Sequence, residues 1–284
     1  MHEACKLPPM RNPAAEDIPG RNPARAAYRL QIYTLGHFTI VADGQQLRHG
    51  RKSPGKSLQL LKALIAFGGR HVEADNLAVI IWPGKEGEQA QRALESTLHR
   101  LRKYLGDDRY LLLDDGMLTL NSDLVWVDVW DFERQLTTLR GLLLQPAHPA
   151  TVTRISAIGD RLMCIYQGNF LSREQPGSWS VLLEECLRRR FVDGMLALGR
   201  FWEERGLPAK AVFFYQKGIV VDDLVETFYQ RLMTCLDETG RQPEAIDCYR
   251  LCRHVLAVAL GQQPTEETQQ IYRSIISHHL PKAS

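Results

Sequence analysis

The sequence predicts a mainly α-helical protein with two domains, a small α+β domain followed by an all-α domain built from helical repeats. Three observations predict this fold class. Residues 28–48 alternate apolar and polar side chains, as short antiparallel strands do. Residues 54–105 contain three amphipathic helical patterns, and two short apolar runs flank a turn within residues 109–121. Beyond residue 127 the periodicity is almost entirely helical.

The length and composition set the domain boundaries that we expect. A chain of 284 residues is long enough for two domains that each bury a core. The first 28 residues contain five prolines and little apolar periodicity, so we expect a disordered tail there. We place the α+β domain at residues 29–123 and the helical domain at residues 124–284.

The bulk properties narrow the class of protein. The net charge is only +2, so any nucleic-acid site must be local rather than spread over the surface. The six cysteines form no paired framework, which favours a reducing compartment. No apolar run approaches the ~20 residues that span a bilayer. We therefore expect a cytoplasmic protein without a membrane segment.

The elements of the first domain follow in a recognisable order. Strands within residues 28–48 turn at Gly36 and at Asp43-Gly44. Helices are expected at residues 54–67, 73–82 and 89–105, and each pattern stops at a glycine or at Pro83-Gly84. The two apolar runs after them form a hairpin around Asp115-Gly116. Strands, three helices and a hairpin are the layout of a winged helix-turn-helix of the OmpR type, which carries an extra N-terminal sheet.

The third helix, residues 89–105, has the pattern of a DNA reader. Its leucines gather on one face, and a polar, largely basic set gathers on the other, with Arg102 at the boundary: Arg92, Ser96, His99, Arg100 and Lys103. Arginine can pair with guanine edges in a major groove, while lysine and serine can hold phosphates. Most amphipathic basic helices are simply solvated, but the preceding short helix and the following hairpin supply the rest of a docking motif.

Other cations in the first domain are weaker candidates for DNA contact. Arg109 stands at the base of the hairpin, and a basic loop at the start of the first helix carries Arg51, Lys52 and Lys56. The hairpin tip itself is acidic, with Asp114 and Asp115 where a wing in a minor groove would profit from Arg or Lys. The third helix must therefore carry most of the affinity.

One motif points to a different function. Residues Gly50 to Ser57, GRKSPGKS, match the phosphate-loop pattern G-x-x-x-x-G-K-[ST]. A working phosphate loop follows a buried apolar strand, whereas the residues before this one, GQQLRH, are polar and lie just past a turn. A nucleotide-dependent switch is therefore the weaker alternative, and we expect no cofactor.

The other residues that could form a metal or catalytic site give only weak signals. Cys248 and Cys252 are one helical turn apart, but a metal would need further ligands, and buried cysteine is common between paired helices. The hydrolase, metalloprotease and dinucleotide-binding motifs do not occur in the sequence. We therefore expect neither a metal site nor an enzyme.

The helical domain contains an internal repeat. Residues 203–216, EERGLPAKAVFFYQ, and residues 237–250, DETGRQPEAIDCYR, align at a spacing of 34 residues. Gly206 matches Gly240 and Ala211 matches Ala245 in this alignment. A period of 34 residues is that of tetratricopeptide repeats, in which small residues let paired helices pack closely.

Several segments together resemble a known family. The stretch WPGKEGEQAQRALESTLHRLRKYLG at residues 82–106, the junction VWVDVWDFERQL at residues 125–136, the segment IYQGNFL at residues 165–171 and the repeats are similar to the bacterial transcriptional activator family of the antibiotic-regulator type. The similarity covers roughly residues 29–280.

The resemblance implies a function and partners. It implies a transcription regulator, an activator by the family's name, that binds double-stranded DNA at tandem direct repeats. It also implies self-association on DNA, and contact with RNA polymerase or another protein through the helical domain. The main alternative is an interaction adaptor whose winged helix no longer reads DNA, which the acidic hairpin tip and the nearly neutral net charge favour.

Overall fold

The computed structural model describes residues 28–47, 55–85, 87–146, 148–172 and 177–279. It divides into two compact units. The first unit contains the described parts of residues 16–138 and 160–187, and the second contains those of residues 139–159 and 188–284. In the part of the chain described here, no helix combines the length and the hydropathy that a bilayer span requires.

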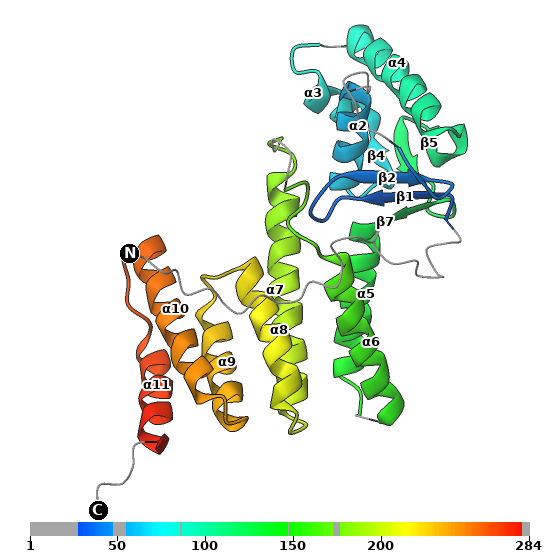
Figure 1. The fold of residues 1–284 in the computed structure, drawn as a ribbon. Coiled ribbons are helices and arrows are strands. Elements are labelled where there is room, and N and C mark those ends of the chain that lie inside the picture. The colour runs from blue at the N-terminus through cyan, green and yellow to red at the C-terminus, as the bar shows by residue number, and fades with distance from the viewer. Residues whose placement is uncertain (1–27, 48–54, 86, 147, 173–176, 280–284) are drawn as a thin grey trace, which may run out of the picture. The chain divides into compact units, whose positions relative to one another are not determined.

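The first unit begins with a four-stranded sheet in the order β3-β2-β1-β7 (Figure 1). Strands β1 (Leu30–Tyr33), β2 (Thr39–Ala42) and β3 (Gln45–Gln46) form the expected antiparallel run. Strand β7 (Val125–Val127) pairs in parallel with β1, Leu30 opposite Val125. The sequence pattern did not predict β7.

Three helices form the next layer of this unit. Helices α2 (Gly55–Ala66), α3 (Ala74–Ile81) and α4 (Gly87–Leu105) confirm the three predicted patterns, and α4 begins two residues earlier than expected. Their apolar faces meet in one core, in which the following side chains are at most 4% exposed: Leu60, Leu61, Leu64, Leu77, Leu98 and Leu101. Burial of these leucines holds α4 against α2 and α3 with its other face exposed.

The predicted hairpin lies in a second, three-stranded sheet. Its strands lie side by side in the order β4 (Val72–Glu73), β6 (Met117–Leu120) and β5 (Leu111–Asp114). A short 3-10 helix, η1 (Asp108–Tyr110), directly precedes β5 in the chain. Asp115 and Gly116 both have positive φ, 45° and 73°, which the tight hairpin turn requires. The amide of Ala74 donates to the carbonyl of Gly116 at 2.8 Å, so the hairpin tip lies at the start of α3.

Our expected boundary at residues 123/124 does not coincide with the division into compact units. Helix α5 (Asp128–Leu143) follows β7 directly, and the buried Asp128 carboxylate accepts hydrogen bonds from the amides of Thr34 and Leu35 at 2.6 and 2.7 Å. The Trp130 indole donates to the carbonyl of Gly68 at 3.0 Å. These contacts tie α5 to the N-terminal sheet and to the end of α2.

Residues 160–187 belong to the same unit for a similar reason. They include the end of α6 (Pro149–Ile165) and the first residues of α7 (Val181–Glu203). The loop between β1 and β2 is hydrogen-bonded to the segment after α6, because Gly36 donates to Asn169 at 3.0 Å and Leu171 donates to Thr34 at 2.8 Å.

The second unit confirms the repeated helical pairs. Its helices include the rest of α7, then α8 (Pro208–Val221), α9 (Glu226–Glu238), α10 (Gln242–Leu260) and α11 (Glu266–His279). The turns from α7 to α8 and from α9 to α10 match, with Gly206 and Gly240 at φ 66° and 72°. Ala211 and Ala245, the matched small residues, are both fully buried. Small side chains at these positions let the paired helices approach closely.

Candidate nucleic-acid interface

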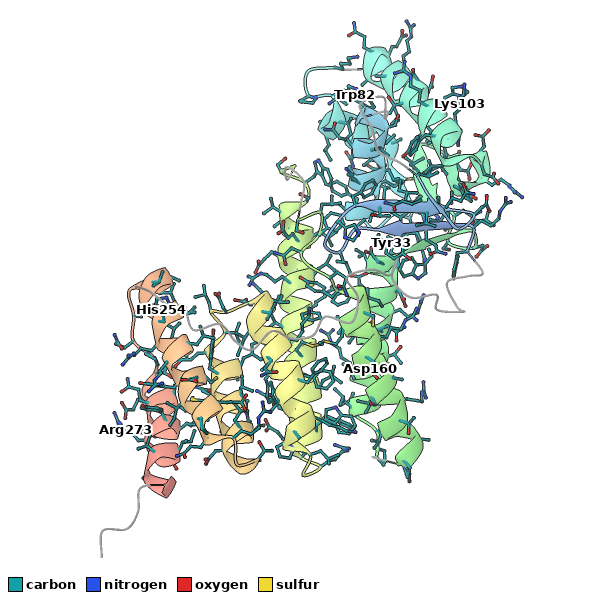
Figure 2. The ribbon with its side chains drawn as sticks, viewed as in Figure 1. Tyr33, Trp82, Lys103, Asp160, His254 and Arg273 are labelled. Atoms are coloured by element: carbon teal, nitrogen blue, oxygen red, sulfur yellow. The ribbon has the colours of Figure 1, made fainter. Side chains whose placement is uncertain are left out.

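The outer face of α4 is polar and exposed. The buried side chains of this helix, Ala90, Leu94, Thr97, Leu98, Leu101 and Leu105, form one stripe. Figure 2 shows Lys103 on the side of α4 that faces away from α2. The exposed face carries Glu88, Gln89, Gln91, Arg92, Glu95, Ser96, His99, Arg100 and Lys103. A helix that is packed along one side and polar along the other can enter a major groove.

Four of the predicted reader residues are free to contact a ligand. Ser96, His99, Arg100 and Lys103 are exposed, and their side chains make no hydrogen bond or ion pair with any other described residue. They lie within the last three turns of α4. The exposed C-terminal half of this helix therefore presents uncompensated positive charge.

Arg92 lies on the same face in the N-terminal half of α4. Its guanidinium donates to Glu88 Oε2 at 2.9 Å, and both side chains are largely exposed, at 79% and 86%. An exposed ion pair between residues four apart on a helix is worth only about 0.3–0.5 kcal/mol. A phosphate could therefore draw Arg92 away from Glu88 at little cost.

Arg102 has a structural contact rather than a free guanidinium. It is half-buried, and its Nε and one terminal nitrogen donate to the carbonyl oxygen of Leu111 at 3.1 and 2.7 Å. Leu111 begins β5, the edge strand of the small sheet. Arg102 thus fastens α4 to the base of the hairpin, so two of its nitrogens already donate within the fold, and its predicted role as a DNA reader stays a prediction.

The predicted cations outside α4 are engaged within the fold or lie outside the described residues. Lys56 Nζ donates to the carbonyl of Ile81 at 2.9 Å, at the last residue of α3, where a positive charge complements the helix dipole. Arg109 pairs with Asp107 at 2.7 Å, and its hydrogen bonds lower the pKa of Asp107 to about 2. Arg51 and Lys52 lie outside the described residues.

The end of the GRKSPGKS motif is built into the helix-turn-helix. Ser57 is buried, and its hydroxyl donates to the carbonyl of Thr97 at 3.2 Å across to α4. Lys56 is held at the end of α3, as described above. In a phosphate loop this hydroxyl would bind Mg²⁺ and this ammonium would reach the phosphates. Their contacts in the fold speak against a nucleotide site.

The hairpin has features that sequence reasoning partly missed. Asp114 and Asp115 are exposed, as expected of an acidic tip, and the neighbouring Glu73 is exposed beside them across the small sheet. Leu112 and Leu113 are also 45% and 41% exposed. The apolar run of β5 predicted a strand, and all four residues of β5 pair with β6. Because β5 is the edge strand of this sheet, pairing with β6 on one side does not bury Leu112 and Leu113.

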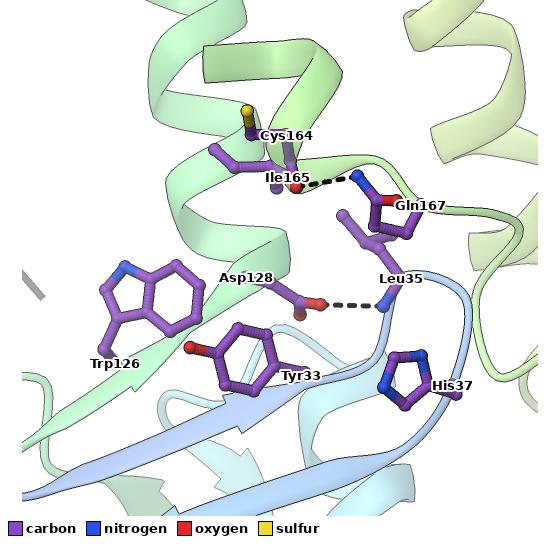
Figure 3. A pocket seen from close by; sticks show the side chains of 8 residues that line it. All are labelled: Tyr33, Leu35, His37, Trp126, Asp128, Cys164, Ile165 and Gln167. Carbon is purple, nitrogen blue, oxygen red and sulfur yellow. Dashed lines mark hydrogen bonds between the residues drawn. The ribbon is translucent and has the colours of Figure 1, made fainter. Parts of the chain in front are cut away.

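A small cavity lies beside the N-terminal sheet (Figure 3). Its volume is about 20 Å³, and Tyr33, Leu35, His37, Trp126, Asp128, Cys164, Ile165 and Gln167 line it. A space of this size holds about one water molecule. The Asp128 carboxylate at its wall is already fully hydrogen-bonded. The cavity offers too little room for an organic cofactor.

The described residues also offer no metal centre. No three His, Cys, Asp or Glu side chains among them are grouped so that they could hold an ion. Cys248 and Cys252 are both buried in α10, and burial raises the pKa of the Cys252 thiol to about 12. A thiol that resists ionisation is a poor metal ligand.

Comparisons with known sequences find relatives that are named as regulators. The chain is 28% identical over 221 residues to the transcriptional regulator RedD of Streptomyces coelicolor, covering 74% of this chain and 61% of that protein. It is 27% identical over 230 residues to the regulatory protein AfsR of Streptomyces griseus, covering 76% of this chain and 22% of that protein. The chain thus spans less than two thirds of the length of these relatives.

A solved structure shares the fold. The Mycobacterium tuberculosis protein EmbR, in complex with a low affinity phosphopeptide, superposes with a TM-score of 0.63 at 19% identity, over 90% of this chain and 67% of that one. The sequence model of the bacterial transcriptional activator domain matches residues 127–276, more than half of the 284 residues. The chain therefore belongs to the bacterial transcriptional activator domain family.

Proposed function

We propose that this protein is a cytoplasmic, DNA-binding transcription regulator, an activator by family kinship, that reads a major groove with α4. The observation that carries the proposal is the free, exposed set Ser96, His99, Arg100 and Lys103 on a helix whose other side is packed against α2 and α3. The relatives RedD and AfsR, named as regulators, support it. No catalytic role is part of the proposal.

Two substitutions on α4 separate base reading from phosphate binding. Arg100→Ala is expected to cost about 1–3 kcal/mol at the specific site, because a guanidinium that pairs with a guanine edge discriminates between sequences. Lys103→Ala is expected to weaken binding to every sequence alike and to reduce the salt slope by about one unit, because it removes one phosphate contact. Fluorescence anisotropy with specific and scrambled duplexes, titrated over salt, measures both effects.

Arg102→Ala is the matched control for charge. It removes the same charge from α4 as Arg100→Ala, but it breaks the contact with Leu111. It should lower the thermal midpoint of the protein, whereas Arg100→Ala should leave the midpoint unchanged. Equal, sequence-blind losses of DNA affinity for Arg100→Ala and Lys103→Ala would contradict the assignment of roles.

We further propose that the second compact unit, called the helical unit below, holds several copies of the chain together on DNA. Stacked helix pairs form extended surfaces that suit a second copy of the chain, RNA polymerase or another protein. On duplexes with two direct repeats, the full-length chain should bind cooperatively, because protein contacts raise the effective concentration at the second repeat. A gel-shift titration compares one repeat with two, and with two repeats offset by half a helical turn. Non-cooperative binding to all three duplexes would contradict a role of the helical unit in assembly on DNA.

A second candidate is a protein-interaction adaptor whose winged helix does not read DNA. The observation that favours it is the hairpin, in which the exposed side chains of Leu112 and Leu113 are followed directly by the acidic Asp114 and Asp115. Exposed leucines beside carboxylates suit a protein partner better than a phosphate backbone. A selection from randomised duplexes distinguishes the two candidates, because an adaptor would enrich no sequence.

A further inference from the structure

Helix α4 has two chemically different flanks on its exposed face. Glu88, Gln91 and Glu95 follow one another at spacings of three and four residues, so they share one flank. Ser96, Arg100 and Lys103 follow the same spacings and share the other flank. Glu95 and Arg100 are five residues apart, which separates them by about 140° around the helix axis. All six of these side chains are exposed.

The two flanks cannot play the same part in a groove. On the basic flank, Lys103 can bind a phosphate and Arg100 can pair with a guanine edge, whereas a phosphate repels the carboxylates on the other flank. A carboxylate accepts hydrogen bonds but donates none, so on DNA its favourable partners are amino groups on base edges. The N4 amino group of cytosine in the major groove is such a partner. The acidic flank is therefore suited to base edges rather than to the backbone.

The two carboxylates on this flank differ in their contacts. Glu88 lies in the first turn of α4 and accepts from Arg92 at 2.9 Å. Glu95 lies in the middle of the helix, and its Oε1 accepts a longer hydrogen bond from Gln91 at 3.3 Å. The Oε2 atom of Glu95 has no hydrogen bond to a described residue. Gln91 thus orients the Glu95 carboxylate and leaves one of its oxygens available.

We propose that Glu95 is a specificity residue that accepts a hydrogen bond from the N4 amino group of a cytosine in the major groove. The inference rests on the proposed function, since it requires that α4 enters the groove. It adds a carboxylate to a set of readers that the sequence pattern limited to basic, hydroxyl and imidazole groups. A negative charge on a DNA-facing helix lowers the affinity for every DNA sequence. In this proposal the Glu95 carboxylate also discriminates between base pairs.

The test is a selection of randomised duplexes with the full-length chain. The wild-type protein should prefer C at one position of its half-site, and Glu95→Gln should change that preference to A, because a carboxamide pairs with N6 and N7 of adenine. The ratio of the dissociation constants for the A and C duplexes should change by about tenfold. Glu95→Ala should lose the preference at that position and keep the remaining ones.

Glu88→Gln is the matched control, because it removes the same charge from the same flank two turns away. It should strengthen binding to all duplexes without changing the base preferred at any position. If Glu95→Gln only strengthens binding in the same uniform way, Glu95 is not a base reader. If Arg100→Ala relaxes specificity while Glu95→Gln changes no preference, this inference fails and the proposed function stands. If the wild-type chain enriches no sequence at all, both fail.

Discussion

Replacing Asp128 by alanine is expected to destabilise the first compact unit, which contains the winged helix, by about 3–5 kcal/mol. Three buried amides and a hydroxyl would lose their common acceptor. The carboxylate accepts from the amides of Thr34, Leu35 and Val129 and from the Thr34 hydroxyl, at 2.6–2.8 Å. Asp128 itself is 1% exposed, so water does not replace these bonds in the native protein. Urea unfolding followed by circular dichroism measures the loss.

Asparagine at this position gives a graded control. Asp128→Asn keeps the volume and one acceptor oxygen, so the bonds to the amides of Thr34 and Leu35 survive while the one from Val129 is lost. We expect a cost of about 1–2 kcal/mol, since one buried donor is left without a partner. A cost for asparagine as large as that for alanine would mean that the charge, and not the set of acceptors, holds the loop.

The pH dependence of this effect has a definite sign. Burial raises the pKa of Asp128 to about 6, and its hydrogen bonds oppose the rise. The unfolded carboxyl titrates near 3.9, so the folded protein binds a proton more tightly than the unfolded chain. The stability that Asp128 contributes is therefore greatest below about pH 4 and declines as the pH rises through 6. The difference between wild type and Asp128→Ala should be about 1 kcal/mol larger at pH 5 than at pH 7.

Local sequence patterns predicted most elements of the fold. The helices α2, α3 and α4 and the β5–β6 hairpin carry their periodicity and turn residues within short windows. Strand β7 has only three residues, and its parallel partner β1 lies some 95 residues earlier, so no local pattern marks it. The division into compact units includes β7 and residues 160–187 with the N-terminal sheet, and these long-range contacts have no local sequence pattern.

The candidate site was predictable to the extent that a helical wheel determines exposure. The wheel separated Arg100 and Lys103 from the buried leucines, and both are exposed. It placed Arg102 at the boundary, but the partner of Arg102 is a carbonyl of β5, and the return of the hairpin to α4 is a tertiary contact. Lys56 is a similar case, since its partner is the end of α3. Basic side chains that a helical wheel predicts as DNA contacts can thus form hydrogen bonds within the fold instead.

Replacing Asp131 by asparagine is expected to destabilise the same unit by about 3–5 kcal/mol, because a partly buried guanidinium would lose its counter-charge. Asp131 is fully buried one turn after Asp128, and its carboxylate accepts from Arg134, Gln135 and Arg161. Arg161, on α6, is only 18% exposed, whereas Arg134 is 58% exposed. The pair with Arg161 therefore joins α5 to α6 across a desolvated contact.

Two comparison variants isolate that contact. Arg134→Ala removes the exposed partner and should cost at most about 1 kcal/mol, as other surface pairs do. The double substitution Asp131→Leu with Arg161→Met removes both buried charges together and should recover most of the stability that Asp131→Asn loses. If the double variant is as unstable as the sum of the single ones, the buried charges are not coupled, and the packing of α5 on α6 must be explained otherwise.

The stability that Asp131 contributes depends on pH in the opposite sense to that of Asp128. Burial raises the pKa of Asp131, but the hydrogen bonds from Gln135 and Arg161 and the nearby guanidinium charges lower it below its ordinary value. The stability that Asp131 contributes is thus present above about pH 4 and is lost as the pH falls through the folded-state pKa. The difference between wild type and Asp131→Asn should shrink below pH 4, while the difference for Asp128→Ala grows from pH 7 to pH 5. Neutral donors surround one aspartate and cations the other, so two carboxylates one helical turn apart should respond to acid in opposite directions, and parallel pH profiles for the two variants would contradict this account.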